Sequence, residues 1–359
     1  KFIMAYTTIN KSTDYFNTAT YTGTGSNQTI SNTFQSDMIW VKGRNYAYNH
    51  SIQDAVRGFS ANKVIYPNLT NVEGHYSDTG YIQSVASNNF VVGTGTHSDD
   101  ANYNDNGSTY VAWNWKANGA GSANTDGTIN STVSVNTTSG FSIVKYVATG
   151  SNATVGHGLG VAPAFIILKN LDTARSWTVG SNGNTDWSNH TYLDATNAQN
   201  SDSSMFQSTA PTSTVFSIGT AAETNESGDN FIAYCFAEKV GYCKVGKYIG
   251  NGSTTAFQQP FIYTGFKPSF VLIKQTTSAT NWEMFDNKRV TAGYPPELHP
   301  NANAAESTPP GDRRLNLLSN GFLIDTSYAD PINKDGNTFL YMAIGQTLTG
   351  SNDVPYTAF

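Results

Sequence analysis

The sequence has little charge, little cysteine and no long apolar run, and each shortage excludes a class of protein. Only 13% of the 359 residues are charged, and the net charge of −6 comes without a basic stripe, which argues against a nucleic-acid partner. No apolar run approaches the roughly 20 residues that cross a bilayer, so we expect no membrane insertion. Two cysteines, Cys235 and Cys243, are too few for a disulfide scaffold. We expect buried or half-buried free thiols, with a hairpin disulfide as the alternative.

The residues that are abundant favour strands and tight turns. The chain has 19 Phe, 20 Tyr and 32 Gly, and short apolar runs bounded by Gly and Asn recur about every 10–20 residues. This spacing is typical of sandwiches and barrels rather than of alternating helices and strands. No stretch keeps a helical period of apolar residues, and only residues 51–58 could hold a helical turn or two. The sequence therefore predicts an all-β protein.

Four landmarks recur in one order, three times along the chain. They are a Tyr-led turn, an apolar strand that ends in Lys, a segment centred on Phe, and an apolar closing strand. The landmarks lie at residues 21–26, 38–42, 88–93 and 110–115; then 146–151, 165–169, 214–219 and 231–236; then 248–253, 270–274, 320–324 and 339–344.

These repeats predict an internal triplication into three tandem β-sandwich, jelly-roll-like domains. The boundaries fall at residues 1–117, 118–240 and 241–346, followed by a tail at 347–359. Residues 118–140 are rich in Asn, Gly, Ser and Thr, which indicates a linker and at most one added strand. The second gap is almost absent, so the second and third domains should abut.

The closing strands carry large side chains that we expect to be buried. Trp113 and Trp115 share one strand face, and the matching positions of the other copies are also large and apolar. Trp40 corresponds to apolar residues in both other copies. We expect each domain to bury these side chains in its own core.

Three aromatic residues are the best candidates for ligand contact. His50, Trp177 and Trp282 each lie eight residues after the Lys of a strand and follow a polar turn. Exposed rings at a loop could stack on a ligand such as a sugar. The alternative is that the three side chains cap the core.

Two acidic–basic pairs recur at a fixed spacing. Asp54 with Arg57, and Asp286 with Arg289, occupy the same positions in the first and third copies. The second copy carries Ser181 and Asn184 there, which argues against catalysis. We expect both pairs to pin a loop.

One stretch resembles a calcium loop. Asp100, Asn102, Asn104 and Asn106 alternate as oxygen donors, which suits Ca²⁺. The glycine and the final glutamate of such loops are missing, so a turn held by side chain to backbone hydrogen bonds is the alternative. We expect no other cofactor.

Several motifs resemble a known family. The segments 112–116, 155–163 and 232–239 are similar to uncharacterised repeat domains found in tail-fibre-like and other virion proteins of marine phages, including those of cyanobacteria. The resemblance spans residue 4 to about residue 346. It implies a virion location and supplies no catalytic residue.

We therefore expect a non-catalytic structural or adhesive virion protein, such as a tail fibre or a tail- or capsid-associated protein. Its expected partners are other virion proteins and a host surface glycan. A homo-oligomer is expected, a trimer for a fibre, although tandem copies could instead give one chain internal pseudo-symmetry. The alternatives are a polysaccharide-degrading tailspike, with two carboxylates about 5–10 Å apart in a cleft, and a secreted lectin.

Overall fold

The computed structural model describes residues 7–96, 102–255, 258–307, 314–326 and 331–346, and these are almost entirely β-structure. They form 24 strands and two single-turn helices, α1 (Ser203–Phe206) and α2 (Ala222–Asn225), with 3₁₀ turns η1 (Ser12–Asp14) and η2 (Ala61–Lys63). Residues 51–58, the one stretch that could have held a helical turn, begin instead with strand β4 (Ser51–Asp54). The fold class is confirmed as all-β, with several separate antiparallel sheets.

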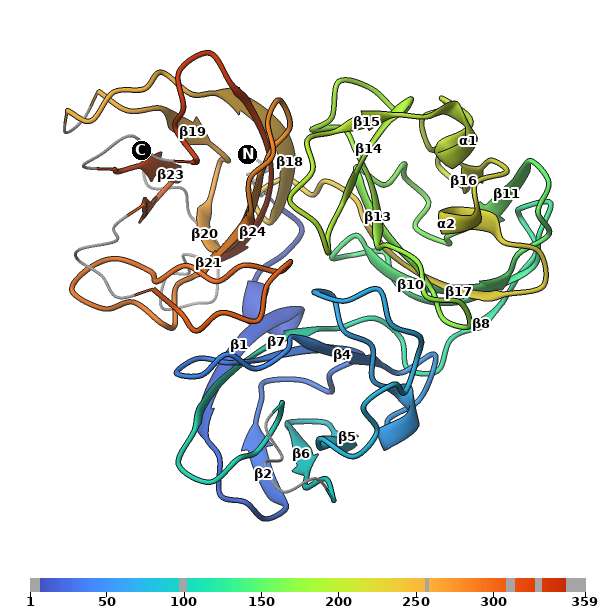
Figure 1. Cartoon of the computed structure of the whole chain (residues 1–359), viewed down its shortest axis with the longest axis horizontal. Helices are drawn as coiled ribbons and strands as arrows, with labels where there is room; N and C mark the ends of the chain where they lie inside the picture. The colour runs from blue at the N-terminus through green and yellow to red at the C-terminus, as the bar shows by residue number, and fades with distance from the viewer. Residues whose placement is uncertain (1–6, 97–101, 256–257, 308–313, 327–330, 347–359) are drawn as a thin grey trace, which may run out of the picture.

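The chain folds into three lobes around a common centre (Figure 1). Lobe 1 comprises residues 7–117, lobe 2 residues 118–240 and lobe 3 residues 241–346. Lobe 1 has the sheet order β1-β7-β3-β4 and a smaller sheet of order β2-β6-β5. Their bounds are β1 (Phe16–Thr22), β2 (Gln28–Ser31), β3 (Met38–Gly43), β4 (Ser51–Asp54), β5 (Tyr81–Ala86), β6 (Asn89–Gly93) and β7 (Thr109–Trp115).

Lobe 2 has the largest sheet, with the order β15-β14-β13-β12-β17-β10-β9-β8, and a second sheet formed by β11 and β16. Their bounds are β8 (Ser122–Asn124), β9 (Ser131–Asn136), β10 (Phe141–Val147), β11 (Ala153–Gly156), β12 (Phe165–Asn170), β13 (Thr178–Ser181), β14 (Asn189–Tyr192), β15 (Asn200–Ser201), β16 (Val215–Ile218) and β17 (Asn230–Phe236). The segment expected as a linker therefore contributes two strands, β8 and β9, to this sheet.

Lobe 3 repeats the arrangement of lobe 1. Its sheets have the orders β18-β24-β20-β21 and β19-β23-β22. Their bounds are β18 (Cys243–Ile249), β19 (Phe261–Tyr263), β20 (Lys267–Gln275), β21 (Trp282–Asp286), β22 (Leu315–Leu318), β23 (Gly321–Ile324) and β24 (Thr338–Gln346). Only residues 237–242 separate β17 from β18, so lobes 2 and 3 abut as expected.

The large sheet of each lobe is built on the same four antiparallel strands. The order β1-β7-β3-β4 recurs as β10-β17-β12-β13 and as β18-β24-β20-β21. The register recurs as well, because the first strand begins opposite the last or nearly last residues of the closing strand, at Phe16 and Trp115, Phe141 and Phe236, and Cys243 and Ile344. The recurring sequence landmarks therefore occupy equivalent places in the three lobes.

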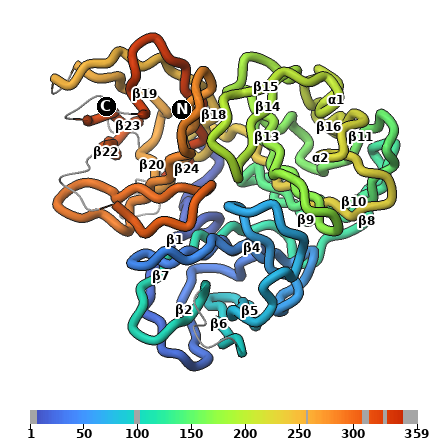
Figure 2. The backbone as a smooth tube through the Cα atoms, in the orientation of Figure 1, coloured from blue at the N-terminus to red at the C-terminus, as the bar shows by residue number. Residues whose placement is uncertain are grey.

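Each of these sheets buries both faces. The outer face packs on the smaller sheet of its own lobe, where three separate apolar clusters form. The inner faces of all three sheets meet in one central core, which includes Trp40, Trp113 and Trp115 of lobe 1, Phe165 and Tyr234 of lobe 2, and Phe270, Trp282 and Met342 of lobe 3. Figure 2 shows the backbones of the three lobes meeting around this centre.

The expected burial of the closing strands is confirmed, but the expected core was wrong. Trp113 is 0% exposed and Trp115 is 2% exposed. Their rings contact Phe270 of lobe 3, and Trp115 also contacts Phe236 of lobe 2. A lobe therefore hides only the outer face of its closing strand by itself, and the other two lobes bury the inner face.

Candidate functional site

The aromatic residues proposed for ligand contact are buried. His50, Trp177 and Trp282 are each 0% exposed, so the prediction of exposed stacking rings is wrong. Each ring is inserted at the seam between two lobes. The Trp177 Nε1 donates hydrogen bonds to the carbonyls of Tyr66 and Leu69 in lobe 1.

The same contact is made around the whole ring of lobes. The Trp282 Nε1 donates to the carbonyl of Tyr192 in lobe 2, at 2.8 Å. His50 of lobe 1 accepts a hydrogen bond from the Trp40 Nε1 on its Nδ1, and its ring lies close to the backbone of His299 in lobe 3. Burial, together with the nearby Lys42 ammonium, lowers the pKa of His50 well below its usual range. His50 therefore stays neutral and serves as a seam residue.

Backbone hydrogen bonds close each seam in the same direction. The N–H groups of Glu73, Gln199 and Glu306 donate to carbonyls of the next lobe, at Leu171, Thr276 and Arg44 respectively. Each accepting carbonyl lies two residues after the Lys of its strand. Three equivalent seams thus close the chain into a ring.

The two predicted structural pairs are confirmed. Asp54 and Arg57 lie 2.6 Å apart, as do Asp286 and Arg289, and all four side chains are 0–1% exposed. Each arginine also binds a second carboxylate, Glu73 for Arg57 and Glu306 for Arg289. A buried pair with satisfied hydrogen bonds is tolerated, whereas either ion alone would be costly.

Each pair also accepts a hydrogen bond from the closing strand of a neighbouring lobe. The Tyr234 hydroxyl of lobe 2 donates to Asp54 Oδ2 at 2.7 Å. The Trp113 Nε1 of lobe 1 donates to Asp286 Oδ2 at 3.0 Å. The pairs therefore hold the seams together and do not only pin loops.

This geometry explains why lobe 2 lacks the pair. The closing-strand residue of lobe 3 that corresponds to Trp113 and Tyr234 is Met342, whose thioether has no proton to donate. In lobe 2 the corresponding acceptor position is Ser181, whose Oγ accepts from the Gly183 N–H instead. Gly183 lies against the closing strand of lobe 3, because a Cβ there would come within 2.5 Å of Leu340 Cβ. At the seam of lobes 2 and 3, the closing-strand donor and the carboxylate that would accept its hydrogen bond are therefore both missing.

Sequence reasoning marked the three strand-ending lysines only as landmarks. Lys42, Lys169 and Lys274 are each 0% exposed. The ammonium groups donate to carbonyls, including those of Thr70 from Lys169 and of Thr196 from Lys274, both in the neighbouring lobe. Burial lowers the pKa of Lys42 to about 7, and those of Lys169 and Lys274 to about 8. The recurrence of a Lys at the end of the same apolar strand in all three copies was the available signal.

The buried lysines predict that stability rises with pH. Their folded-state pKa values lie below the unfolded value of about 10.4, so between pH 7 and 10 the unfolded chain binds more protons. The cost of burying charge is complete below pH 7 and is relieved as the pH rises, by on the order of 1 kcal/mol per lysine. We expect the free energy of unfolding in urea to increase from pH 7 to about 8.5, where the thiols of the unfolded chain begin to ionise and oppose the effect.

Lys169→Met should flatten this dependence, whereas Lys247→Met, at an exposed lysine, should leave it unchanged. An identical pH slope for Lys169→Met and the wild type would contradict the assignment. Above about pH 10 stability should fall again, because burial raises the pKa of tyrosines such as Tyr103 and Tyr146.

The predicted calcium loop uses its side chains for structure. Asn102 accepts from the Asn49 N–H and donates to Thr79 Oγ1. Asn104 accepts from the Thr24 N–H and from Gln28 Nε2. Asn106 is exposed, and Asp100 lies outside the described residues. Asn104 holds the turn after β1 against the segment before β7, and Asn102 ties that segment to Asn49 and Thr79, as the alternative interpretation expected.

Among the described residues, one cluster has donors that suit a metal ion. Glu283, Glu297 and His299 bring one ligand atom each within 4.8 Å of one another. Arg314 already binds Glu297 at 2.7 Å, and His299 Nδ1 lies 3.0 Å from the Trp282 carbonyl. The cluster therefore contributes an ion network beside the Trp282 strand. Lobes 1 and 2 carry Ser51 and Thr178 where lobe 3 has Glu283, so spacing in the sequence did not reveal it.

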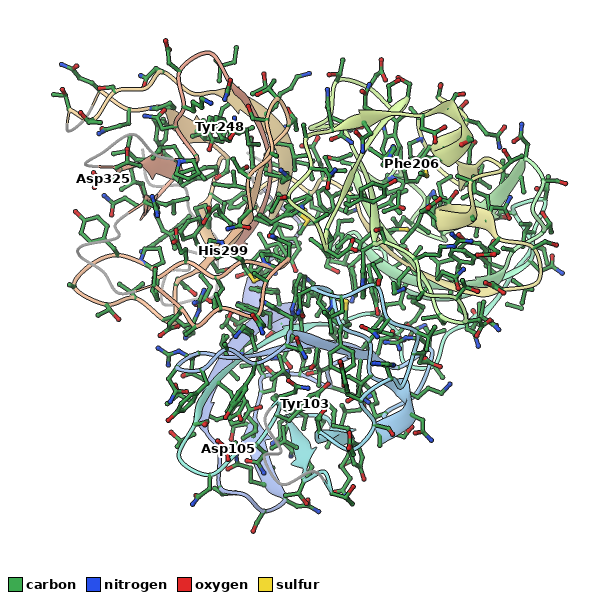
Figure 3. The ribbon with its side chains drawn as sticks, in the orientation of Figure 1. Tyr103, Asp105, Phe206, Tyr248, His299 and Asp325 are labelled. Carbon is green, nitrogen blue, oxygen red and sulfur yellow. The ribbon has the colours of Figure 1, made fainter. Side chains whose placement is uncertain are left out.

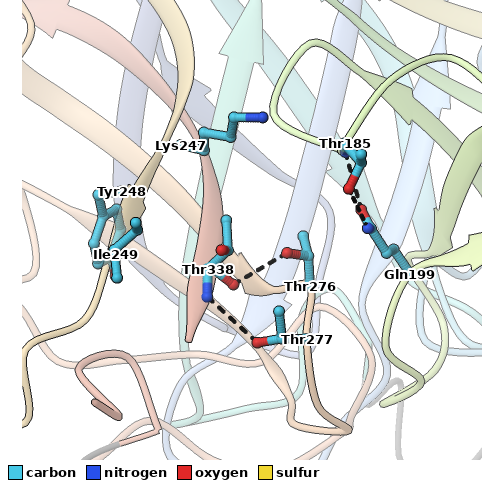
Figure 4. A pocket seen from close by; sticks show the side chains of 8 residues that line it. All are labelled: Thr185, Gln199, Lys247, Tyr248, Ile249, Thr276, Thr277 and Thr338. Atoms are coloured by element: carbon cyan, nitrogen blue, oxygen red, sulfur yellow. Dashed lines mark hydrogen bonds between the residues drawn. The ribbon is translucent and has the colours of Figure 1, made fainter. Parts of the chain in front are cut away.

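A cleft of about 290 Å³ opens at the seam of lobes 2 and 3 (Figure 4). Threonine hydroxyls line it on both sides, and its single charged group is Lys247. Several of these groups bind one another, since Gln199 donates to Thr185 and Thr276 donates to the Thr338 carbonyl. The cleft is a polar gap between lobes whose lining contains no carboxylate.

The remaining predicted chemistry is also structural. Cys235 and Cys243 are free and buried, which confirms the expectation. Burial raises the pKa of both thiols, that of Cys243 to about 12, so neither is a thiolate at neutral pH.

Residues 11–347 match the model of a family described as a domain of unknown function, DUF7483, and the chain belongs to that family. The match is one continuous unit that spans all three lobes. No curated protein matches the sequence. The described residues contain no helix with the length and hydrophobicity needed to span a membrane.

Proposed function

We propose that this protein is a structural and adhesive component of a bacteriophage particle, a tail fibre or a tail- or capsid-associated protein. The motif resemblance supports the virion location. The recurring strand order and register support an internal triplication of a two-sheet β-sandwich domain.

One observation carries the structural role. The three lobes close on a single core, every seam is closed by an equivalent backbone hydrogen bond, and two of the three seams also bury an ion pair. Trp113, Trp177 and Trp282 donate hydrogen bonds across seams, as do the buried lysines Lys169 and Lys274. A body of this kind resists deformation, because moving one lobe would expose the rings of the other two.

The ring of lobes leaves three outer faces for other molecules. We propose that other virion proteins and a host surface glycan are its partners. The expected homo-oligomer, a trimer for a fibre, remains part of this proposal. The internal arrangement favours the alternative that one chain supplies a pseudo-three-fold body by itself.

Localisation tests the proposal. We expect antibodies against this chain, used with gold labelling and electron microscopy, to decorate the tail or the capsid of intact particles. Purified protein should release no reducing ends from host polysaccharide. Particles without label would overturn the virion role, and steady release of reducing ends would favour the tailspike.

A further inference from the structure

The small sheet of lobe 3 displays aromatic rings to solvent. On the edge strand β19, Phe261 is 46% exposed and Tyr263 is 62% exposed, while Ile262 between them is buried. On the other edge strand, β22, Leu318 is 39% exposed. These side chains form what we call the aromatic face: Phe261, Tyr263, Leu318 and the half-buried Leu323.

The other two lobes show that the fold does not need these rings. Ile262 pairs with Phe322, as Ile30 pairs with Phe90 and Val155 pairs with Phe216. The residues on either side of the buried one are Thr29 and Ser31 in lobe 1, and Thr154 and Gly156 in lobe 2. Lobe 1 folds with Thr and Ser at the positions where lobe 3 exposes Phe261 and Tyr263. Because the fold does not require large apolar side chains there, their exposure in lobe 3 indicates a binding surface.

The neighbouring strand makes room for one of the rings. Gly321 on β23 lies opposite Tyr263, and a Cβ there would meet the Ile262 carbonyl oxygen at 2.1 Å and Phe261 Cζ at 3.0 Å, so only glycine accommodates both the β19 backbone and the ring. The Phe261 ring therefore reaches over Gly321 along the sheet. Lobes 1 and 2 carry Asn89 and Val215 at this position, and there the residue matching Phe261 is a threonine. The glycine and the aromatic ring occur together only in lobe 3.

Polar groups flank the aromatic face. Asn316 lies in the same row as Phe261 and Leu323, and its Nδ2 donates to Asp325 Oδ2 at 2.7 Å. Figure 3 shows Asp325 on the side of lobe 3 that faces away from the other lobes. Amide and carboxylate groups beside aromatic rings can bind sugar hydroxyls while the rings contact sugar C–H groups.

The size of the face favours a sugar over a protein. Its four side chains expose apolar area on the order of 300–400 Å², whereas a stable protein interface buries about 800 Å² on each partner. Two rings on alternate positions of one strand suit two adjoining sugar units. We propose that the aromatic face binds carbohydrate by stacking on Phe261 and Tyr263, an inference that rests on the proposed adhesive function and names its ligand class.

Residues borrowed from lobe 1 provide the test. The variant Phe261→Thr/Tyr263→Ser installs the side chains that lobe 1 carries at these positions, so its unfolding curve should match that of the wild type. Both proteins would be applied to an array of purified capsular polysaccharides, lipopolysaccharide O-chains and neutral oligosaccharides such as cellohexaose. Tyr46→Ser is the matched control, because Tyr46 is a 53% exposed aromatic residue of lobe 1.

We expect the wild type and Tyr46→Ser to bind at least one glycan, and the double variant to bind it at least ten-fold more weakly. Equal binding by the double variant, or no binding by the wild type, would overturn the proposal. If no glycan binds and the double variant instead loses self-association or the capture of another protein, the aromatic face is a protein interface and the carbohydrate proposal is overturned. If antibodies label the particles but the wild type binds no glycan, only the carbohydrate-binding inference is rejected. If the wild type binds a glycan but the antibodies do not label particles, only the virion role is rejected.

Discussion

Replacing Arg57 by Asn should lower the free energy of unfolding by about 3–5 kcal/mol, as is typical when one member of a buried ion pair is removed. The change leaves the Asp54 carboxylate, which is 0% exposed, with the Tyr234 hydroxyl as its remaining side-chain partner across the seam. Equilibrium unfolding in urea would measure the loss. Arg175→Asn, which breaks a half-exposed pair with Glu226, should cost less than about 1 kcal/mol.

The seam of lobes 2 and 3 suggests how the loss can be recovered. That seam works with Ser181, Asn184 and Met342 in place of Asp54, Arg57 and Tyr234. We therefore expect the triple variant Asp54→Ser/Arg57→Asn/Tyr234→Met to be more stable than Arg57→Asn alone, because no charge or hydroxyl is then left buried without a partner. If the losses in free energy of unfolding caused by the three single changes simply added in the triple variant, the structural equivalence of the two seams would be refuted.

Removing lobe 3 should abolish the fold of the other two lobes. A chain that ends at residue 240 loses Phe270, which contacts Phe16, Trp113 and Trp115 in the central core. Each exposed aromatic ring forfeits a few kcal/mol, against a total stability of about 5–15 kcal/mol for a typical protein. We expect this fragment to lack near-ultraviolet circular dichroism and a cooperative melting transition, whereas the whole chain should melt in a single transition.

A nicked chain provides the matched control. A protease site placed at the exposed turn at residues 137–138 would cut the backbone and keep every lobe. The nicked protein should retain its near-ultraviolet spectrum. A cooperative, native-like transition in the fragment of lobes 1 and 2 would mean that the lobes are independent domains.

Much of the fold could be predicted because strand signals are local. Alternation placed Trp113 and Trp115 on one buried face, and comparison of the repeats placed Trp40 beside them, since side-chain direction in a strand depends only on neighbouring residues. The ion pairs were found by their recurrence at one spacing. The role of these ion pairs at a seam could not be predicted, because Tyr234, which binds Asp54, is 180 residues away from it in the sequence.

The errors also have a common physical cause. His50, Trp177 and Trp282 follow polar turns, and a polar turn is usually a surface signal. The groups that cover them come from other lobes, as when Tyr66 and Leu69 cover Trp177 across more than 100 residues of sequence. The aromatic face went unnoticed for the converse reason, since Phe261 and Tyr263 flank a buried residue and resemble core aromatics.

The sequence by itself determined the strands, their inward faces and the three-fold recurrence, because each of these depends on residues close together in the chain. Only the tertiary structure decided that the inward faces meet in one core and that the landmark residues fasten three seams. Burial at a seam is supplied by residues 90 to 180 positions away, and no local pattern carries that information.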